Sequence, residues 1–173
     1  MIGRAALSAL LLMLPAAALA AYVPSAPATY GYGLLDDSES AGPDGGMLFA
    51  TQPTASGAEM KLNLVLVYNV PKADPSVAGP LVSFVVMPLA ISCAAKTARQ
   101  FAPAVFDGAG NAIAVVAPGE WGVSAPVPEP EDGTVEPGYE AYKLACGLRT
   151  MTRTFHTIDE AVKFTRSPKP AKP

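Results

Sequence analysis

The most regular hydrophobic run of the chain is KLNLVLVYNV, at positions 61–70. Every second side chain of this run, beginning at Leu62, is apolar or aromatic, which is the period of a β-strand. The other face carries Lys61 and two asparagines together with Val65 and Val67. The pattern therefore predicts a strand with one face in the core and one face that is half polar.

Three further runs towards the C-terminus also read as strands. The run at 81–91 is rich in valine and apolar on both faces, which indicates a central strand, although Pro88 requires a bulge or an unpaired edge there. The runs at 100–106 and 112–117 flank Asp107-Gly108-Ala109-Gly110-Asn111, a strong signal for a hairpin turn. We expect a mainly antiparallel sheet of about four to six strands.

The clearest helix signal runs from Pro137, which suits the first helical position, to Gly147, which suits the C-terminal cap. Within it, Tyr139, Tyr142 and Cys146 are spaced three and four residues apart, so they share one face of the helix. That face must look towards the sheet if Cys146 is to reach the other cysteine of the chain.

The N-terminus has the three parts of a secretory signal peptide. Arg4 supplies a positive start, an apolar run follows at 5–14, and Ala18-Leu19-Ala20 has the small-x-small form of a cleavage site. An uncleaved anchor is the alternative, but Pro15 interrupts the run before the about 20 apolar residues that a spanning helix needs. We expect residues 1–20 to be removed, which leaves an exported protein with no transmembrane segment.

Export changes the interpretation of the two cysteines, Cys93 and Cys146. In an oxidising compartment an even pair most simply forms one disulfide. Closing a loop of this length stabilises the fold by roughly 4 kcal/mol in the chain-entropy model. A catalytic thiol or a metal pair is the alternative, but the cysteines lie far apart and neither has a histidine beside it. We expect neither a metal nor a cofactor.

The composition argues against an enzyme and against a nucleic-acid-binding protein. The chain has 173 residues with 18 prolines and 15 glycines, so long helices are excluded and strands and loops must dominate. A single histidine removes most metal sites and the hydrolases that use a Ser-His-Asp triad. The net charge of -3 gives no overall footprint for nucleic acid. We expect no catalytic residues.

The net charge conceals an asymmetry along the chain. Residues 21–147 carry five basic and 13 acidic side chains, whereas residues 148–173 carry six basic and two acidic ones. Thr157-Ile158-Asp159-Glu160 has the form of a capping box, which predicts a short helix that ends before Pro168 and precedes a disordered tail. The basic residues form a candidate patch for an anionic lipid, a polysaccharide or an acidic partner: Arg149, Arg153, Lys163, Arg166, Lys169 and Lys172. A solvated terminus that aids solubility is the alternative.

The order of these features resembles the bacterial surface-adhesin protein E-like family over residues 47–147. The resemblance rests on a cysteine that closes the long strand, an arginine that opens the next one, a glycine turn, a lone tryptophan, and a Pro-Gly pair before the second cysteine. In this chain these are Cys93, Arg99, Phe106-Asp107-Gly108-Ala109-Gly110, Trp121, Pro137-Gly138 and Cys146.

Members of that family have a small antiparallel sheet with a C-terminal helix disulfide-linked to it. The founding member binds host extracellular-matrix components and can dimerise, so the resemblance implies adhesion as one role and a homodimer as one assembly. The chain departs from the family pattern at Ser92 and Tyr139, and it lacks the lipid-anchored start. No ligand-contacting residue is transferred.

Together these observations predict an α+β protein in four parts. They are the signal peptide at 1–20, an irregular lead-in at 21–46, the surface-adhesin protein E-like domain at 47–147, and the basic, partly disordered extension at 148–173. We expect an exported, non-enzymatic envelope or surface protein, periplasmic or extracellular, that binds a macromolecular partner as an adhesin-like module. The alternative is a periplasmic accessory or structural protein with no host ligand.

Overall fold

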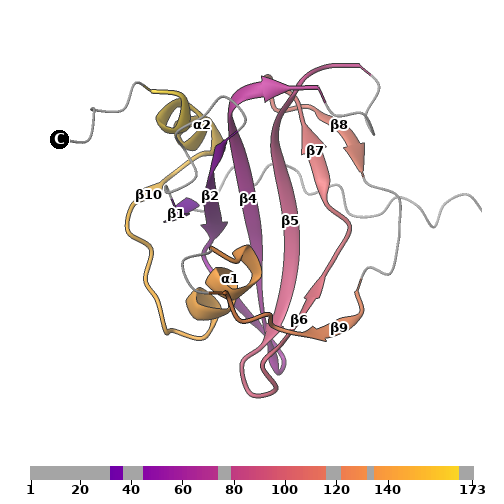
Figure 1. Ribbon diagram of the computed structural model, residues 1–173, viewed down its shortest axis with the longest axis vertical. Helices are drawn as coiled ribbons and strands as arrows, with labels where there is room; N and C mark the ends of the chain where they lie inside the picture. The colour runs from indigo at the N-terminus through magenta and orange to yellow at the C-terminus, as the bar shows by residue number, and fades with distance from the viewer. Residues whose placement is uncertain (1–31, 37–44, 74–78, 116–121, 132–134, 168–173) are drawn as a thin grey trace, which may run out of the picture.

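The structure is a computed structural model that describes residues 32–36, 45–73, 79–115, 122–131 and 135–167. The predictions for residues 1–20 and for Trp121 lie outside this part of the chain. The described residues form two α-helices and one sheet of ten strands, all paired antiparallel (Figure 1). The predicted α+β fold is thus confirmed, with more strands than the four to six expected because several are only two to four residues long.

The elements follow one another along the chain with the two helices near the C-terminus. The strands are β1 (Tyr32–Asp36), β2 (Gly46–Thr51), β3 (Thr54–Ser56), β4 (Glu59–Lys72), β5 (Val82–Ser92), β6 (Thr97–Gln100), β7 (Ala104–Phe106), β8 (Ala112–Val115), β9 (Ser124–Pro126) and β10 (Thr154–Phe155). The helices are α1 (Pro137–Ala145) and α2 (Ile158–Arg166).

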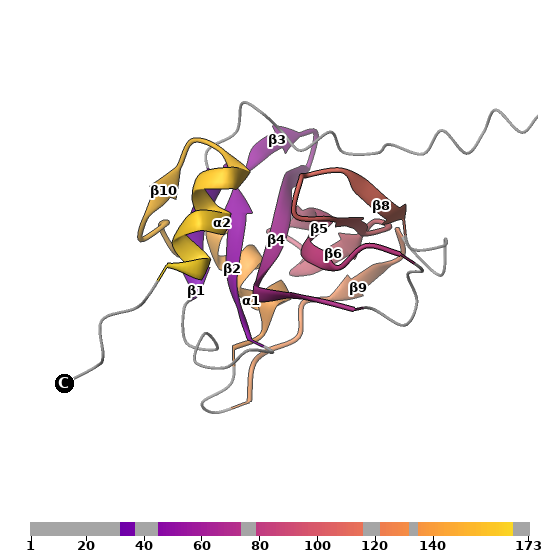
Figure 2. The ribbon, with the colours of Figure 1, turned by 90° about the horizontal axis from the view of Figure 1, so that it is seen from above.

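The two longest strands, β4 and β5, form the centre of the sheet. The main path of neighbouring strands is β10-β1-β2-β4-β5-β6-β9, while β3 pairs with β4, β7 pairs with β5 and β8 pairs with β7. Seen from above, both helices lie beside the half of the sheet that contains β1, β2 and β4 (Figure 2). In this view the strands β6, β8 and β9 lie farther from the helices, on the other side of β5.

The first face of the sheet packs against α1. Alternate residues of β4, Leu62 and Leu64, are buried on this face. They belong to a core cluster with Leu35, Leu48, Ala50, Leu89, Ile91, Ala141, Tyr142, Leu144 and Ala145. Burying a leucine or isoleucine side chain contributes about 1.5–3 kcal/mol, which explains why this leucine-rich face is closed by a helix.

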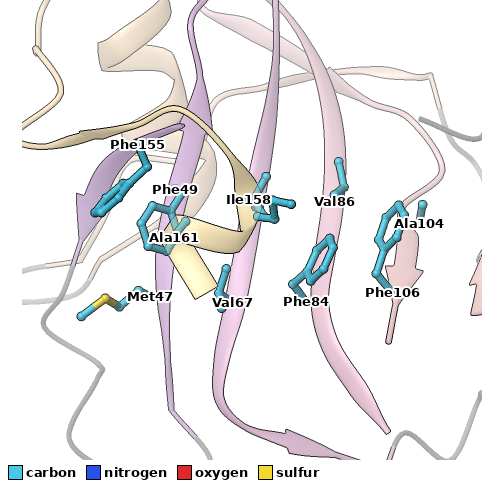
Figure 3. Packing of buried hydrophobic residues seen from close by; sticks show 11 residues of the cluster. Met47, Phe49, Val67, Phe84, Val86, Ala104, Phe106, Phe155, Ile158 and Ala161 are labelled. Carbon is cyan, nitrogen blue, oxygen red and sulfur yellow. The ribbon is translucent and has the colours of Figure 1, made fainter. Parts of the chain in front are cut away.

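The second face is also a core, and this corrects the prediction that it is half polar. Val65 and Val67 are 1% and 0% exposed, and their cluster comprises Met47, Phe49, Phe84, Val86, Ala104, Phe106, Phe155, Ile158 and Ala161. Figure 3 shows α2 near Met47, Phe49 and Val67 of β2 and β4, with Phe84, Val86 and Phe106 continuing the cluster away from the helix. The polar residues of this face lie on either side of the two buried valines: Lys61 is exposed, and Asn63 and Asn69 are half-buried.

The packed unit reaches beyond residues 47–147 at both ends. At the N-terminal end, the lead-in contributes β1, which pairs with β2 on one side and with β10 on the other. At the C-terminal end, residues 154–166 form β10 and α2 and contribute Phe155, Ile158 and Ala161 to the core. The extension that was expected to be a basic appendage is therefore part of the fold over most of its described length.

Pro88 lies within the central strand β5, opposite Asn63 of β4. Its carbonyl accepts a hydrogen bond from the N–H of Phe101. Phe101 lies in the interval between β6 and β7, and these two strands pair with β5 on either side of Pro88. Because the N and C=O of one strand residue point to the same side, the missing N–H of Pro88 faces this interval. The predicted unpaired position is thus confirmed. Within the predicted run 100–106, only Gln100, which ends β6, and Ala104–Phe106, which form β7, are strand residues.

Candidate functional site

The disulfide joins Cys93, directly after β5, to Cys146, directly after α1. The Cα atoms are 5.6 Å apart, and this predicted bridge is confirmed. The helix end that presents Cys146 is closed as expected: Gly147 has a φ of 70°, its N–H donates to the Leu144 carbonyl at 3.3 Å, and the Leu148 N–H donates to the Lys143 carbonyl at 2.8 Å. The bridge therefore fixes the end of α1 to the edge of the β5–β6 turn.

Arg149, a member of the predicted basic patch, is used inside the fold. Its guanidinium donates to the Glu140 carboxylate and to the Leu35 carbonyl. Glu140 is 7% exposed, and its other carboxylate oxygen lies 2.6 Å from the ammonium of Lys143. Because a buried carboxylate needs charged partners, Arg149 holds α1 to β1 and is not available to a ligand.

Arg166, at the end of α2, is also used inside the fold. Its guanidinium donates to Ser83 Oγ at 2.6 Å and to the Tyr68 carbonyl at 3.3 Å. Burial lowers the pKa of Arg166 below its ordinary value, although a guanidinium stays charged at every physiological pH. This residue ties α2 to β4 and to β5.

Arg153 has different surroundings. It is an exposed residue whose guanidinium carbon lies 4.3 Å from the ring centroid of Phe164 and 5.4 Å from that of Phe155. The two rings are 5.1 Å apart, and both belong to or pack against the core beneath α2. Within the described part of the chain, the side chain of Arg153 has no hydrogen bond or ion pair. Its N–H groups therefore remain available at the surface.

Lys163 is the second cation of the predicted patch that stays at the surface. It is exposed, and among the residues that the structure describes it forms no ion pair with Asp159 on the same helix. Lys169 and Lys172 lie outside those residues. Of the six predicted cations, the structure thus leaves Arg153 and Lys163 at the surface beside Phe164, and it places Arg149 and Arg166 in structural contacts.

The N-terminus of α2, the helix that carries Lys163 and Phe164, is capped by side chains. Thr157 Oγ1 accepts from the Glu160 N–H at 3.2 Å, and the Glu160 carboxylate accepts from the His156 N–H at 2.8 Å. The predicted capping box is thus confirmed, with the carboxylate reaching one residue further back than the usual partner. His156, the histidine of the chain, is exposed next to this cap.

Sequence reasoning missed the two phenylalanine rings that support Arg153. One signal was present: Arg153 and Phe155 alternate in Arg-Thr-Phe, so in a strand their side chains share one face. The contact with Phe164 depends on how α2 packs on the sheet, which the sequence pattern does not specify.

The hydrogen bonds around Asp107 change the pKa of its carboxyl. Its carboxylate accepts from the N–H groups of Ala109 and Asn111 at 2.9 and 2.8 Å and from the Asn111 side-chain amide at 3.0 Å. These hydrogen bonds, led by the one from the Asn111 side chain, lower the pKa of Asp107. The carboxylate closes the turn between β7 and β8, which is a structural role.

The described residues hold neither a metal-ligand cluster nor a membrane-spanning helix. They contain no group of three or more histidine, cysteine, aspartate or glutamate side chains placed to hold a metal ion. Within the same ranges, no helix has the length and apolar character needed to cross a membrane.

Comparison of the chain with models of protein families, with curated proteins and with solved structures found no match.

Proposed function

We propose that the chain is an exported, non-enzymatic bacterial protein of the cell envelope or cell surface that binds a macromolecular partner, with adhesion as one form of that binding. The observation that carries the proposal is the Cys93–Cys146 disulfide, which joins α1 to the sheet. Disulfides persist in oxidising compartments outside the cytoplasm. The signal-like sequence at residues 1–20 provides the route to such a compartment.

A binding role is supported by how the fold uses its ionisable groups. Glu140, Arg149 and Arg166 connect helices to strands, and Asp107 closes a turn. These groups serve the scaffold and do not converge on a shared reaction centre. The scaffold in turn presents Arg153 and Lys163 on its surface, which suits recognition of a partner.

The proposal is tested by locating the protein in the cells that produce it. Intact cells are treated with an external protease, the periplasm is then released, and the fractions are probed with antibody against the folded chain. Cleavage in intact cells supports a surface-exposed binding protein. Protection until the outer membrane is opened identifies a periplasmic accessory or structural protein with no host ligand. A chain that stays in the cytoplasm with residues 1–20 attached overturns the proposal.

A further inference from the structure

We propose that Arg153, held on the rings of Phe155 and Phe164, forms with Lys163 a binding surface for the carboxylates of an acidic segment in a protein partner. This inference rests on the proposed function, since it assigns the partner's chemistry. Arg153 directly precedes β10 and Phe155 belongs to β10, while Lys163 and Phe164 are neighbours on α2.

The rings hold the guanidinium of Arg153 in one place before any partner arrives. A long arginine side chain normally loses rotamer freedom when it binds, and this loss opposes binding. Here the guanidinium carbon is 4.3 Å from the Phe164 centroid and 5.4 Å from the Phe155 centroid. Cation–π attraction of this kind restrains an arginine without using its N–H groups, so those groups remain free to form a bidentate pair with a carboxylate.

The backbone beneath the rings is also fixed. Phe155 pairs with Tyr32 of β1 and packs edge-on against Phe49, with centroids 5.7 Å apart. Phe164 and Lys163 belong to α2, which is capped at Thr157 and tied to the sheet by Arg166. The surface therefore stands on strands and a helix, and the backbone that carries both cations is fixed in the free protein.

The charges and apolar residues around this surface favour a protein segment over a polyanion or a membrane. Asp159 and Glu160 are both exposed on the first turn of α2, so a densely charged polyanion meets repulsion there, whereas an isolated carboxylate can reach the two cations. The large hydrophobic side chains that are strongly exposed in the described ranges, Val70, Leu81, Val123 and Leu148, lie outside β10 and α2. A membrane surface would thus find no exposed apolar anchor on these two elements.

The test uses the purified chain with its disulfide formed, and the probe is a fluorescein-labelled peptide in which single glutamates are separated by neutral residues. We expect the peptide to bind, binding to weaken as salt is added, and a matched glutamine peptide not to bind. Arg153→Gln should weaken binding about tenfold, because it removes charge-assisted hydrogen bonds. Lys163→Gln should weaken it by a smaller factor, and Lys61→Gln, an exposed lysine on β4, serves as the matched control that leaves it unchanged.

Two further variants separate a fixed guanidinium from positive charge alone. Arg153→Lys keeps the charge and Phe164→Leu keeps the arginine, yet each should weaken binding several-fold because one loses the planar fork and the other loses the supporting ring. Thermal unfolding of each variant verifies that it remains folded at the temperature of the assay. Equal binding by Arg153→Lys, Phe164→Leu and wild type contradicts the proposed arrangement.

The remaining outcomes identify the partner class or reject the surface. Binding to phosphatidylglycerol vesicles or to polygalacturonate that depends on Arg153, without binding to the glutamate peptide, overturns the assignment to a protein partner. The absence of peptide binding up to millimolar concentration overturns it as well. The peptide assay uses purified protein, so a failure to bind does not change the conclusion from cell fractionation. Conversely, a cytoplasmic location does not by itself alter the affinity for the peptide.

Discussion

Arg149 and Arg153 are separated by three residues, and the fold gives them different surroundings. Arg149 joins the buried carboxylate of Glu140 to the carbonyl of Leu35, whereas Arg153 rests on two rings at the surface. Charge counting cannot separate such residues, because it treats every cation of a segment alike. Whether an arginine has a structural role depends on whether it lies opposite a buried acid. The sequence indicates the burial of Glu140 only through its position on the helix.

The difference predicts unequal effects on stability. Arg149→Ala should lower the free energy of unfolding by about 3 kcal/mol, because it leaves a buried carboxylate with only Lys143 as a partner. Arg153→Ala should lower it by only about 0.5–1 kcal/mol, the size of an exposed cation–π contact. Urea unfolding followed by circular dichroism measures both. Equal losses for the two variants would contradict the assigned roles.

Asp107 gives a prediction for pH dependence. Its pKa in the folded protein lies below the ordinary aspartate value, so its contribution to stability is present above that ordinary value and is lost as pH falls through the folded-state pKa. Asn111→Ala removes the side-chain hydrogen bond and should raise the pKa of Asp107 towards the value of a free aspartate. An NMR titration of the side-chain carboxyl carbon measures both proteins. An unchanged pKa in the variant argues against this hydrogen bond as the main cause.

At the scale of elements, α2 and β10 close the second face of the sheet. The capping box of α2 was visible in the sequence, as was the strand β4 that the helix contacts. Their contact was not, because an amphipathic helix does not specify which surface it packs against, and asparagines on β4 made the second face look half polar. The strand β1 escaped detection for a similar reason, since its five residues acquire a partner on each side only in the folded sheet.

Phe155 tests whether this C-terminal segment belongs to the core. Phe155→Ala should destabilise the protein by about 3–5 kcal/mol, as expected for a buried phenylalanine that contacts Phe49. Leu148→Ala is the matched control from the same segment, and its side chain is 66% exposed, so it should change stability by less than about 0.5 kcal/mol. If both variants unfold at the same denaturant concentration as the wild type, residues 148–167 are an appendage and not a part of the fold.

At the scale of the whole molecule, one helix packs on each face of the sheet, and one disulfide joins α1 to it. The first and last described strands, β1 and β10, are neighbours in this sheet. The helix and its bridge were predictable because cap residues and cysteine spacing are local signals that tertiary packing left unchanged. The full extent of the sheet was not, since the short edge strands depend on contacts between distant parts of the chain, as between Gly33 and Thr154. The same long-range contacts decide which cations reach the surface.

The central claim is that this disulfide-linked fold forms outside the cytoplasm, and mass analysis of the protein from its producing cells tests it most directly. The protein is alkylated without reduction and then digested. We predict a chain that begins at Ala21, no alkylated cysteine, and one pair of peptides joined through Cys93 and Cys146. A chain that retains residues 1–20 and carries two alkylated cysteines would contradict the account.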